Sequence, residues 1–327
     1  MRNFLLFLIS LVFAVVPSVV SAQHYTLLET KTFDIINKYA VQNNGGSVAT
    51  RVTAKILIGG SSESLYQQKV RFRVIPTQTS KSVDGLGNIY CTVDLGNLNP
   101  GEKKYIIVEK VVKNSGITFN DDIYQMRPDY AEFLAQPGNK QYVLPSKNIE
   151  SDAPEIKAEA THINIANPVA QQAKDIHLGV NVFLDYTLDE TYAHRGALNA
   201  LRTHKGVCTE FAGLFVAFCR AVGIPARVVN GYWLHNDTPM QVNVPVDVHG
   251  VRHAWAEFYL PDVGWVPAEL TALQYVQYPN AAVQRYSNAD SFAKILPNGV
   301  FIDNVKRFCL QQGIVLGGND RRDNGKD

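Results

Sequence analysis

The stretch from Phe211 to Val222 is apolar on nearly every side, and this feature constrains the fold more than any other. A helix that is apolar all round lies buried in the middle of a domain, whereas a surface helix has a polar face. The stretch ends at Gly223, a residue suited to closing a helix, and Pro225 follows shortly after. We therefore expect a central helix that is packed against other elements on all sides.

Cys208 lies at the N-terminal end of this predicted helix, in the segment Gly206-Val-Cys208-Thr-Glu. The free N–H groups and partial positive charge of a helix start stabilise a thiolate and can also hold an oxyanion. Gly206, which has no side chain, would let a substrate backbone approach. A free cysteine is usually an inert, buried side chain. Cys219, in the middle of the helix, fits that interpretation, whereas Cys208 fits a nucleophile.

The other cysteines do not form a metal-binding pattern. None of the four cysteines belongs to a C-x-x-C pair, and the chain contains no H-E-x-x-H. A disulfide between Cys219 and Cys309 is one alternative in an oxidising compartment. The other is that both are buried small apolar side chains. We expect neither a metal nor a cofactor.

The segment from His253 to Glu269 predicts two strands joined by a turn at Pro261-Asp262. Alternate residues of a strand share a face, so Trp255 is expected on the same face as His253. If the strands pair about Pro261, Glu269 stands directly opposite His253, within reach of a carboxylate–imidazole hydrogen bond. A slip of one residue would instead turn Glu269 to the other face.

Together, these residues predict a site for nucleophilic catalysis. A thiol nucleophile needs a base, which is usually a histidine. A carboxylate can fix the tautomer of that histidine and stabilise its imidazolium. We therefore expect Cys208 to attack, His253 to take and return the proton, and Glu269 to orient His253. The alternatives are a strand histidine satisfied by backbone contacts and a plain surface carboxylate.

The N-terminus has the pattern of a secretory signal peptide. Arg2 is followed by an apolar run from Phe4 to Val16, and the small residues of Val20-Ser21-Ala22 match a cleavage site. A membrane anchor is the alternative, but the run is shorter than the ~20 apolar residues of a spanning helix. We expect residues 1–22 to be removed after Ala22, which would leave a secreted or periplasmic chain without a membrane contact.

Residues 23–125 predict a β-sandwich domain. The alternating runs, which are separated by Gly, Asn and Pro residues, lie at 51–58, 69–75, 89–93 and 104–112. Several short alternating runs with turn residues between them are typical of a sandwich. This region contains no catalytic constellation, so a structural or substrate-presenting role is expected for it.

Residues 126–155 are rich in proline and poor in periodic apolar positions, which predicts a linker on the surface. Helical spacing then begins near Asn167-Pro168 and continues to Phe183. We assign residues 156–327 to one catalytic domain. Removal of residues 1–22 from the 327 would leave 305, which suits two domains of ordinary size.

The charge of the chain argues against some classes of partner. The formal net charge is +1, and the basic residues are scattered. Neither nucleic acid nor an anionic membrane surface is therefore expected as a partner. The oligomeric state does not follow from the sequence.

Three segments resemble the core of the transglutaminase-like superfamily, and they lie within residues 155–320. The segments are Gly206-Val-Cys208-Thr-Glu-Phe-Ala, Ala221 to Tyr232, and His253-Ala-Trp with Gly264-Trp-Val-Pro. The resemblance implies an α+β chain in which an N-terminal β-sandwich precedes a papain-like transglutaminase core. In that core the cysteine starts a central helix that is packed on an antiparallel sheet.

The resemblance also implies a Cys–His–Asp triad that acts on amides through a thioester. Cys208 and His253 match its first two members, and Glu269 stands in place of the aspartate with one methylene more. Tyr186 stands where many relatives have a tyrosine, which would donate to the oxyanion or simply pack. We place Tyr186 and Trp255, with Gly206, in the oxyanion or substrate region.

We therefore expect an exported cysteine-dependent amide hydrolase or acyltransferase whose partner is a protein or peptide substrate. The resemblance is to secreted bacterial proteins with a β-rich N-terminal domain, for which hydrolysis is commonly inferred and cross-linking is the other outcome. The alternative is a catalytically degenerate binding or assembly module on the same scaffold, supported by Glu269. The distances that join Cys208, His253 and Glu269 discriminate between the two.

Overall fold

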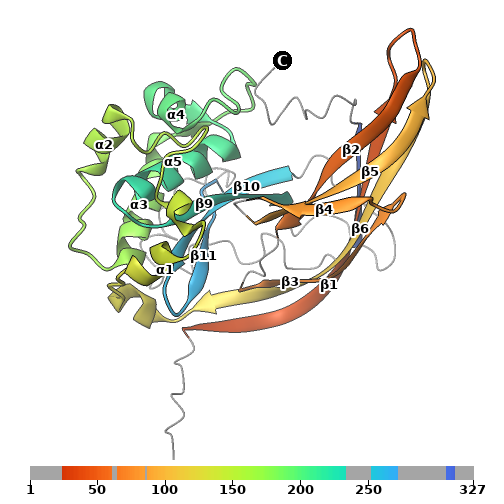
Figure 1. The fold of residues 1–327 in the computed structure, drawn as a ribbon. Coiled ribbons are helices and arrows are strands. Elements are labelled where there is room, and N and C mark those ends of the chain that lie inside the picture. The colour runs from red at the N-terminus through yellow and green to blue at the C-terminus, as the bar shows by residue number, and fades with distance from the viewer. Residues whose placement is uncertain (1–23, 61–64, 85–86, 233–251, 272–306, 314–327) are drawn as a thin grey trace, which may run out of the picture.

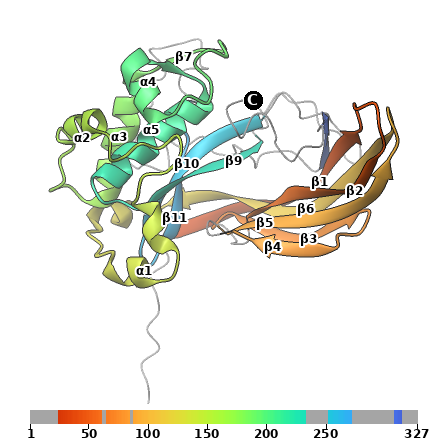
Figure 2. The same ribbon diagram turned by 45° about the horizontal axis from the view of Figure 1, so that its top comes forward.

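The computed structural model describes residues 24–60, 65–84, 87–232, 252–271 and 307–313, so the predicted signal segment 1–22 lies outside the described residues. The described chain is α+β, as predicted. The helices gather on one side and the long strands of the first half on the other. Between them lie β9 (Ala226–Tyr232), β10 (Arg252–Leu260) and β11 (Gly264–Ala268) (Figures 1 and 2). Among the described residues, no helix combines the length and apolar character needed to cross a bilayer.

The first half of the chain forms a β-sandwich, which confirms the prediction. One sheet has the order β12-β1-β6-β3, and the other has the order β2-β5-β4. The strands are Tyr25–Gln42 (β1), Ala49–Gly60 (β2), Gln67–Ile75 (β3), Ser80–Val83 (β4), Asn88–Leu98 (β5), Lys103–Phe119 (β6) and Arg307–Gly313 (β12). β12 pairs in parallel with β1. A segment that the sequence assigns to the second domain therefore adds an edge strand to the first.

The sandwich core consists of alternate residues from both sheets, because a strand turns every second side chain inward. The buried residues are Tyr39, Val41, Ala54, Ile56, Ile58, Val74, Ile89, Cys91, Val93, Leu95, Leu98, Ile106 and Val108. All four alternating runs found in the sequence lie within strands. β1 has no individual prediction, because the buried Asn37 interrupts its apolar alternation.

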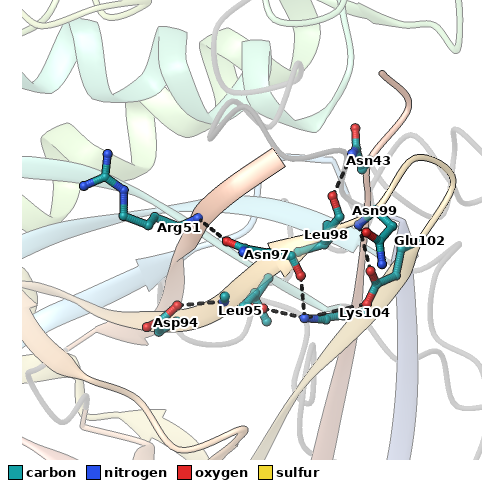
Figure 3. A network of polar contacts seen from close by, with 10 residues as sticks. Asn43, Arg51, Asp94, Leu95, Asn97, Leu98, Asn99, Glu102 and Lys104 are labelled. Carbon is teal, nitrogen blue, oxygen red and sulfur yellow. Dashed lines mark hydrogen bonds and ion pairs between the residues drawn. The ribbon is translucent and has the colours of Figure 1, made fainter. Parts of the chain in front are cut away.

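A polar network closes the sandwich where β5 turns into β6 (Figure 3). Lys104 Nζ donates to the carbonyl oxygens of Leu95, at 2.6 Å, and Asn97, at 2.9 Å. The Arg51 N–H donates to Asn97 Oδ1 at 3.0 Å. The register between β2 and β5 shifts here. These contacts therefore satisfy main-chain groups that a regular ladder would have paired.

The predicted linker 126–155 contains short helices and packs against the second half of the chain. After η1 (Asp121–Gln125), it holds α1 (Ala131–Ala135) and η2 (Asn139–Tyr142). The Phe133 ring stacks on Tyr259 with the ring centroids 3.9 Å apart, and Tyr142 meets Trp265 edge-on at 4.8 Å. Aromatic residues between the prolines therefore fix this segment to the hairpin that carries Tyr259 and Trp265.

The second half places helices on a three-stranded antiparallel sheet with the order β11-β10-β9. The helices are α2 (Pro154–Ala160), α3 (Val169–Phe183), α4 (Ala197–Thr203) and α5 (Cys208–Ala221). The strands are β9 (Ala226–Tyr232), β10 (Arg252–Leu260) and β11 (Gly264–Ala268), and β7 (Asp185–Tyr186) pairs with β8 (Lys205–Gly206). This arrangement is the papain-like α+β core that the resemblance implies.

Helix α5 is the predicted central helix. Its apolar side chains lie in the core formed with β10 and the neighbouring helices. The helix closes on Gly223, whose φ is +85°. The Gly223 N–H bonds the Arg220 carbonyl at 3.0 Å, and the Ile224 N–H bonds the Cys219 carbonyl at 2.8 Å. This pair of bonds is the Schellman motif, which ends the helix where the sequence predicts.

Candidate active site

Cys208 is the first residue of α5, and its side chain is half-buried. Val207 before it is extended, with φ −98° and ψ −172°. The N–H groups of Glu210 and Phe211 bond the Val207 carbonyl at 3.0 and 3.2 Å. The N–H groups of Cys208 and Thr209 lie in the first turn and have no acceptor within the helix. The sulfur is therefore attached to a backbone that presents N–H donors and partial positive charge.

His253 and Glu269 form the other part of the site. His253 lies on β10 and Glu269 directly follows β11, and they are only 6% and 3% exposed. Nε2 of His253 is 2.5 Å from Oε2 of Glu269. His253 also hydrogen-bonds Cys208. Because Glu269 occupies Nε2, Nδ1 is the ring nitrogen that faces the sulfur. The structure thus brings carboxylate, imidazole and thiol together in one row.

The surroundings of His253 favour its protonated form. Burial lowers the pKa, but the hydrogen bonds to Cys208 and Glu269 and the charges of these two groups outweigh it. The pKa of His253 is consequently raised to about 9. At neutral pH this ring is an imidazolium beside the sulfur, so it can give a proton to a leaving group there.

The register of the β10–β11 hairpin differs by two residues from the prediction. Glu257 pairs with Pro267, whereas the predicted register places Trp255 there. The loop has three residues, 261–263, instead of a turn centred on Pro261. Asp262 has φ +66° and Gly264 has φ +104°, and positive φ values of this kind are typical of three-residue hairpin loops.

This register makes Glu269 a diagonal neighbour of His253. Continued beyond the end of β11, it would place Thr271 opposite His253. A shift of two residues preserves the face of the sheet, so Glu269 still points toward the imidazole. A diagonal pair is farther apart than a directly opposed pair. The extra methylene of glutamate covers part of that distance, which gives a structural reason for glutamate at this position.

The Glu269 carboxylate is also held from its other side. Its Oε1 accepts bonds from the Thr271 N–H, at 2.8 Å, and from Thr271 Oγ1, at 2.7 Å. The backbone of the same segment is bonded by α3: His177 Nε2 donates to the Glu269 carbonyl at 2.6 Å, and Asn181 Nδ2 donates to the Leu270 carbonyl at 2.7 Å. The sequence gives no prediction for His177 or Asn181, because nothing in the helical pattern identifies their partners.

Gly206 has a different role from the predicted one. It is buried, and a Cβ atom at this position would lie 2.3 Å from Cβ and 2.8 Å from Cγ of Glu210. The Glu210 side chain fills the space because it folds back over the helix start. Its Oε1 accepts from the Arg195 N–H at 2.9 Å, and its Oε2 accepts from the Val207 N–H at 3.3 Å. Gly206 therefore admits a side chain of the protein rather than a substrate backbone.

We expect Gly206→Ala to lower the free energy of unfolding by about 2–4 kcal/mol, because a buried carboxylate would lose its donors. Thermal or urea unfolding measures this loss. The matched control is Gly213→Ala in the adjoining helix α5, where the added Cβ would meet the Asn148 carbonyl at an ordinary 3.5 Å. Equal stability of the two variants would contradict this role for Gly206.

Trp255 is part of a contact between the two halves of the chain. Its side chain is buried, and Nε1 donates to Tyr66 Oη at 3.2 Å. Tyr66, which directly precedes β3, donates to Glu257 Oε1 at 3.0 Å, and Arg227 Nε donates to Glu257 Oε2 at 2.7 Å. The indole N–H of Trp255 is therefore hydrogen-bonded to a residue of the first half of the chain. The structure gives no support to the prediction that Trp255 contacts substrate.

Tyr186 lies beside the cysteine segment. In the parallel pairing of β7 and β8, Tyr186 is the register partner of Gly206. Its half-buried ring lies 6.0 Å, between centroids, from that of Phe211 in α5. This placement combines packing with proximity to the start of α5, so donation to an oxyanion stays a prediction.

The other described cysteines are inert packing residues. Cys91 lies in the sandwich core and Cys219 in the middle of α5, and both are fully buried free thiols. Burial raises the pKa of both thiols. Cys219 is a free thiol among the described side chains, and the side chain of Cys309 lies outside them, so the alternative of a disulfide between the two stays a prediction.

Comparison with known sequences gives one family match. Residues 157–270 match the family model of the Transglutaminase-like superfamily. The protein-glutamine gamma-glutamyltransferase of Pseudomonas aeruginosa is 38% identical over 69 residues, which are 21% of this chain and 10% of that protein. The uncharacterized protein YebA of Bacillus subtilis is 26% identical over 182 residues, which are 49% of this chain and 24% of that protein. The chain therefore spans a quarter or less of the length of these relatives.

Comparison with solved structures supports the fold. A Cytophaga hutchinsonii protein described as a cysteine protease aligns with 76% of this chain and 79% of its own, with a TM-score of 0.54. The aligned residues are 18% identical. The likeness therefore concerns the fold alone.

Proposed function

Residues 157–270 of this chain belong to the transglutaminase-like superfamily, and from this premise we propose that the protein is an exported, cysteine-dependent amide hydrolase or acyltransferase. Its substrates are protein or peptide amides. The observation that carries the proposal is the row of contacts from Glu269 Oε2 to His253 Nε2, at 2.5 Å, and from His253 to Cys208. A nucleophile, a base and an orienting group within hydrogen-bond reach are the parts that thiol catalysis needs. The signal pattern at 1–22 supports export.

The reaction begins when the Cys208 sulfur, whose proton lies on His253, attacks the carbonyl carbon of the amide. The oxyanion that forms accepts a hydrogen bond from the Cys208 main-chain N–H. The C–N bond then breaks, His253 gives its proton to the leaving amine, and the acyl group remains on sulfur as a thioester. Glu269 stabilises the imidazolium and holds the ring in the orientation that both proton transfers require.

The thioester is resolved by a second nucleophile. Water or a lysine amine attacks the thioester carbonyl, His253 takes the proton from the attacking atom, and the Cys208 sulfur leaves. Water yields a carboxylic acid, and a lysine amine yields a new amide. The name of the Pseudomonas relative supports amine transfer as one of the outcomes.

The alternative is a catalytically inactive binding or assembly module. Its main support is glutamate in place of aspartate at position 269. The diagonal geometry removes that support, since Glu269 reaches His253 from its position after β11. Intact contacts on both sides of His253 favour the enzyme over the module.

The proposal is tested by incubating the protein with a peptide library and a primary-amine donor, with Cys208→Ala as the control. Mass spectrometry reads peptide cleavage, deamidation and amine incorporation in the same sample. The proposal predicts at least one of these products with the wild-type protein and none above background with Cys208→Ala. Identical product patterns for the two proteins would refute it.

Glu269→Gln should shift the alkaline limb of the pH–rate profile to lower pH. The contacts that raise the pKa of His253 favour its charged form, so the imidazolium that protonates the leaving amine persists up to about pH 9 and is lost above it. Glutamine keeps the length of the side chain and removes its charge, which lowers the pKa of His253. The measurement is amide turnover from pH 6 to 10. An unchanged limb would show that Glu269 does not stabilise the imidazolium.

A further inference from the structure

We propose that His177 and Asn181 of α3 are positioning residues for the catalytic carboxylate. They bond the backbone of the segment that carries Glu269, at the point where strand pairing no longer holds it. This inference rests on the proposed function, because it assigns to both residues an effect on His253 that is transmitted through Glu269.

The first observation is that the sheet ends before Glu269. The ladder between β10 and β11 runs from the Leu260–Gly264 pair to the Ala256–Ala268 pair. Glu269 is the next residue and lies outside that ladder. Its side chain must nevertheless meet His253 as a diagonal neighbour, and a backbone displacement of about 1 Å at such a site is enough to impair catalysis. Another element must therefore fix this part of the chain.

The second observation is that α3 supplies the missing bonds. His177 and Asn181 are four residues apart, so they lie on one face of the helix. Their side chains donate to two consecutive carbonyls, those of Glu269 at 2.6 Å and Leu270 at 2.7 Å. The two residues are 0% and 8% exposed. Buried side-chain donors bonded to a backbone segment restrain it strongly, because a shift would leave polar groups unsatisfied.

The protonation state of His177 suits this task. A carbonyl oxygen only accepts, so Nε2 must carry a proton. Burial lowers the pKa of His177, and the bond to Glu269 only partly offsets that effect. The ring is therefore neutral at pH 7 with its proton on Nε2, and it places no positive charge behind Glu269 that would compete with His253. A glutamine side chain carries its amide nitrogen the same number of bonds from Cβ and can replace this donor.

The test measures the iodoacetamide labelling rate of Cys208 by peptide mass spectrometry, from pH 5 to 10, so it needs no substrate. His177→Leu removes the donor and is expected to slow labelling about 3- to 10-fold near neutral pH. It should also shift the pH profile of labelling in the same direction as Glu269→Gln does when that variant is labelled in parallel. His177→Gln is expected to stay within about twofold of the wild type. Asn181→Ala, the second variant, is expected to show a smaller loss and keeps the test valid if His177→Leu does not fold.

The decisive comparison uses the Glu269→Gln background. If His177 acts through the carboxylate, His177→Leu changes labelling less than about twofold once Glu269 is already replaced. An equal loss in both backgrounds, or an unchanged rate and pH profile in folded His177→Leu and Asn181→Ala, would overturn the inference. Neither result touches the proposed function, which fails separately if wild-type Cys208 labels no faster than a free thiol and does so independently of His253.

Discussion

Cys208→Ala is expected to abolish amide cleavage, deamidation and amine incorporation, a loss of ~10⁴-fold or more that ends at the background of the assay. The sulfur is the atom that carries the acyl group, and no other described cysteine can replace it, since Cys91 and Cys219 are fully buried. The fold should persist, because Cys208 lies half-buried at a helix start and contributes little to the core. Product formation followed by mass spectrometry measures the loss.

Cys219→Ala is the matched control for this experiment. Cys219 lies on the same helix but in the core, so its replacement should lower the stability by ~1 kcal/mol and leave turnover within about twofold at temperatures where the variant is folded. Residual turnover in Cys208→Ala, or a comparable loss in folded Cys219→Ala, would remove Cys208 from the role of nucleophile.

His253→Ala is expected to lower turnover by ~10²–10⁴-fold, the usual contribution of general acid–base catalysis. The ring bonds both Cys208 and Glu269, and its raised pKa keeps it protonated beside the sulfur. Without the ring, the thiol loses its proton acceptor and the leaving amine loses its proton donor. The value of kcat/KM on a peptide found to react in the library experiment measures the effect.

His162→Ala serves as the control for this prediction. His162 pairs with Glu159 at the surface, and its side chain is 78% exposed. Its replacement should leave turnover unchanged. A loss of less than tenfold in His253→Ala would exclude this histidine as the catalytic base.

The central helix and the nucleophile at its start could be predicted from local sequence alone. An all-round apolar run fixes a buried helix, and Gly223 and Pro225 fix its end. The sandwich strands follow from their alternation in the same way. Each of these features depends on residues that are close together in the chain, so the local pattern of the sequence is enough to predict it.

The detailed arrangement around the carboxylate could not be predicted in this way. The register depends on a three-residue loop in which Asp262 adopts a positive φ, and a two-residue shift leaves the apolar pattern unchanged. His177 bonds a carbonyl 92 residues away, and Tyr66 bonds a carboxylate 191 residues away. Contacts between residues so far apart in the chain cannot be predicted from the spacing or periodicity of the sequence.

The sequence identifies Gly206 as a position that needs glycine, but it does not identify the neighbour that requires it. Its lack of a side chain does matter, but a buried neighbour uses the space. A glycine in front of a nucleophile invites the expectation of substrate approach. Glu210 is the third residue of α5, and an acidic side chain at this position commonly folds back to bond the N–H of the residue before the helix. Its presence in the sequence could have indicated that the space beside Gly206 is filled.

The proposed mechanism is tested most directly by the rate at which iodoacetamide labels Cys208 at pH 6, in the wild type and in His253→Ala. An ordinary thiol, with a pKa near 8.5, is less than ~1% thiolate at this pH and labels slowly. We expect wild-type Cys208 to label at least tenfold faster than a free cysteine, and His253→Ala to remove this advantage. Slow labelling of Cys208 that does not depend on His253 would contradict the proposal that the two residues share one proton.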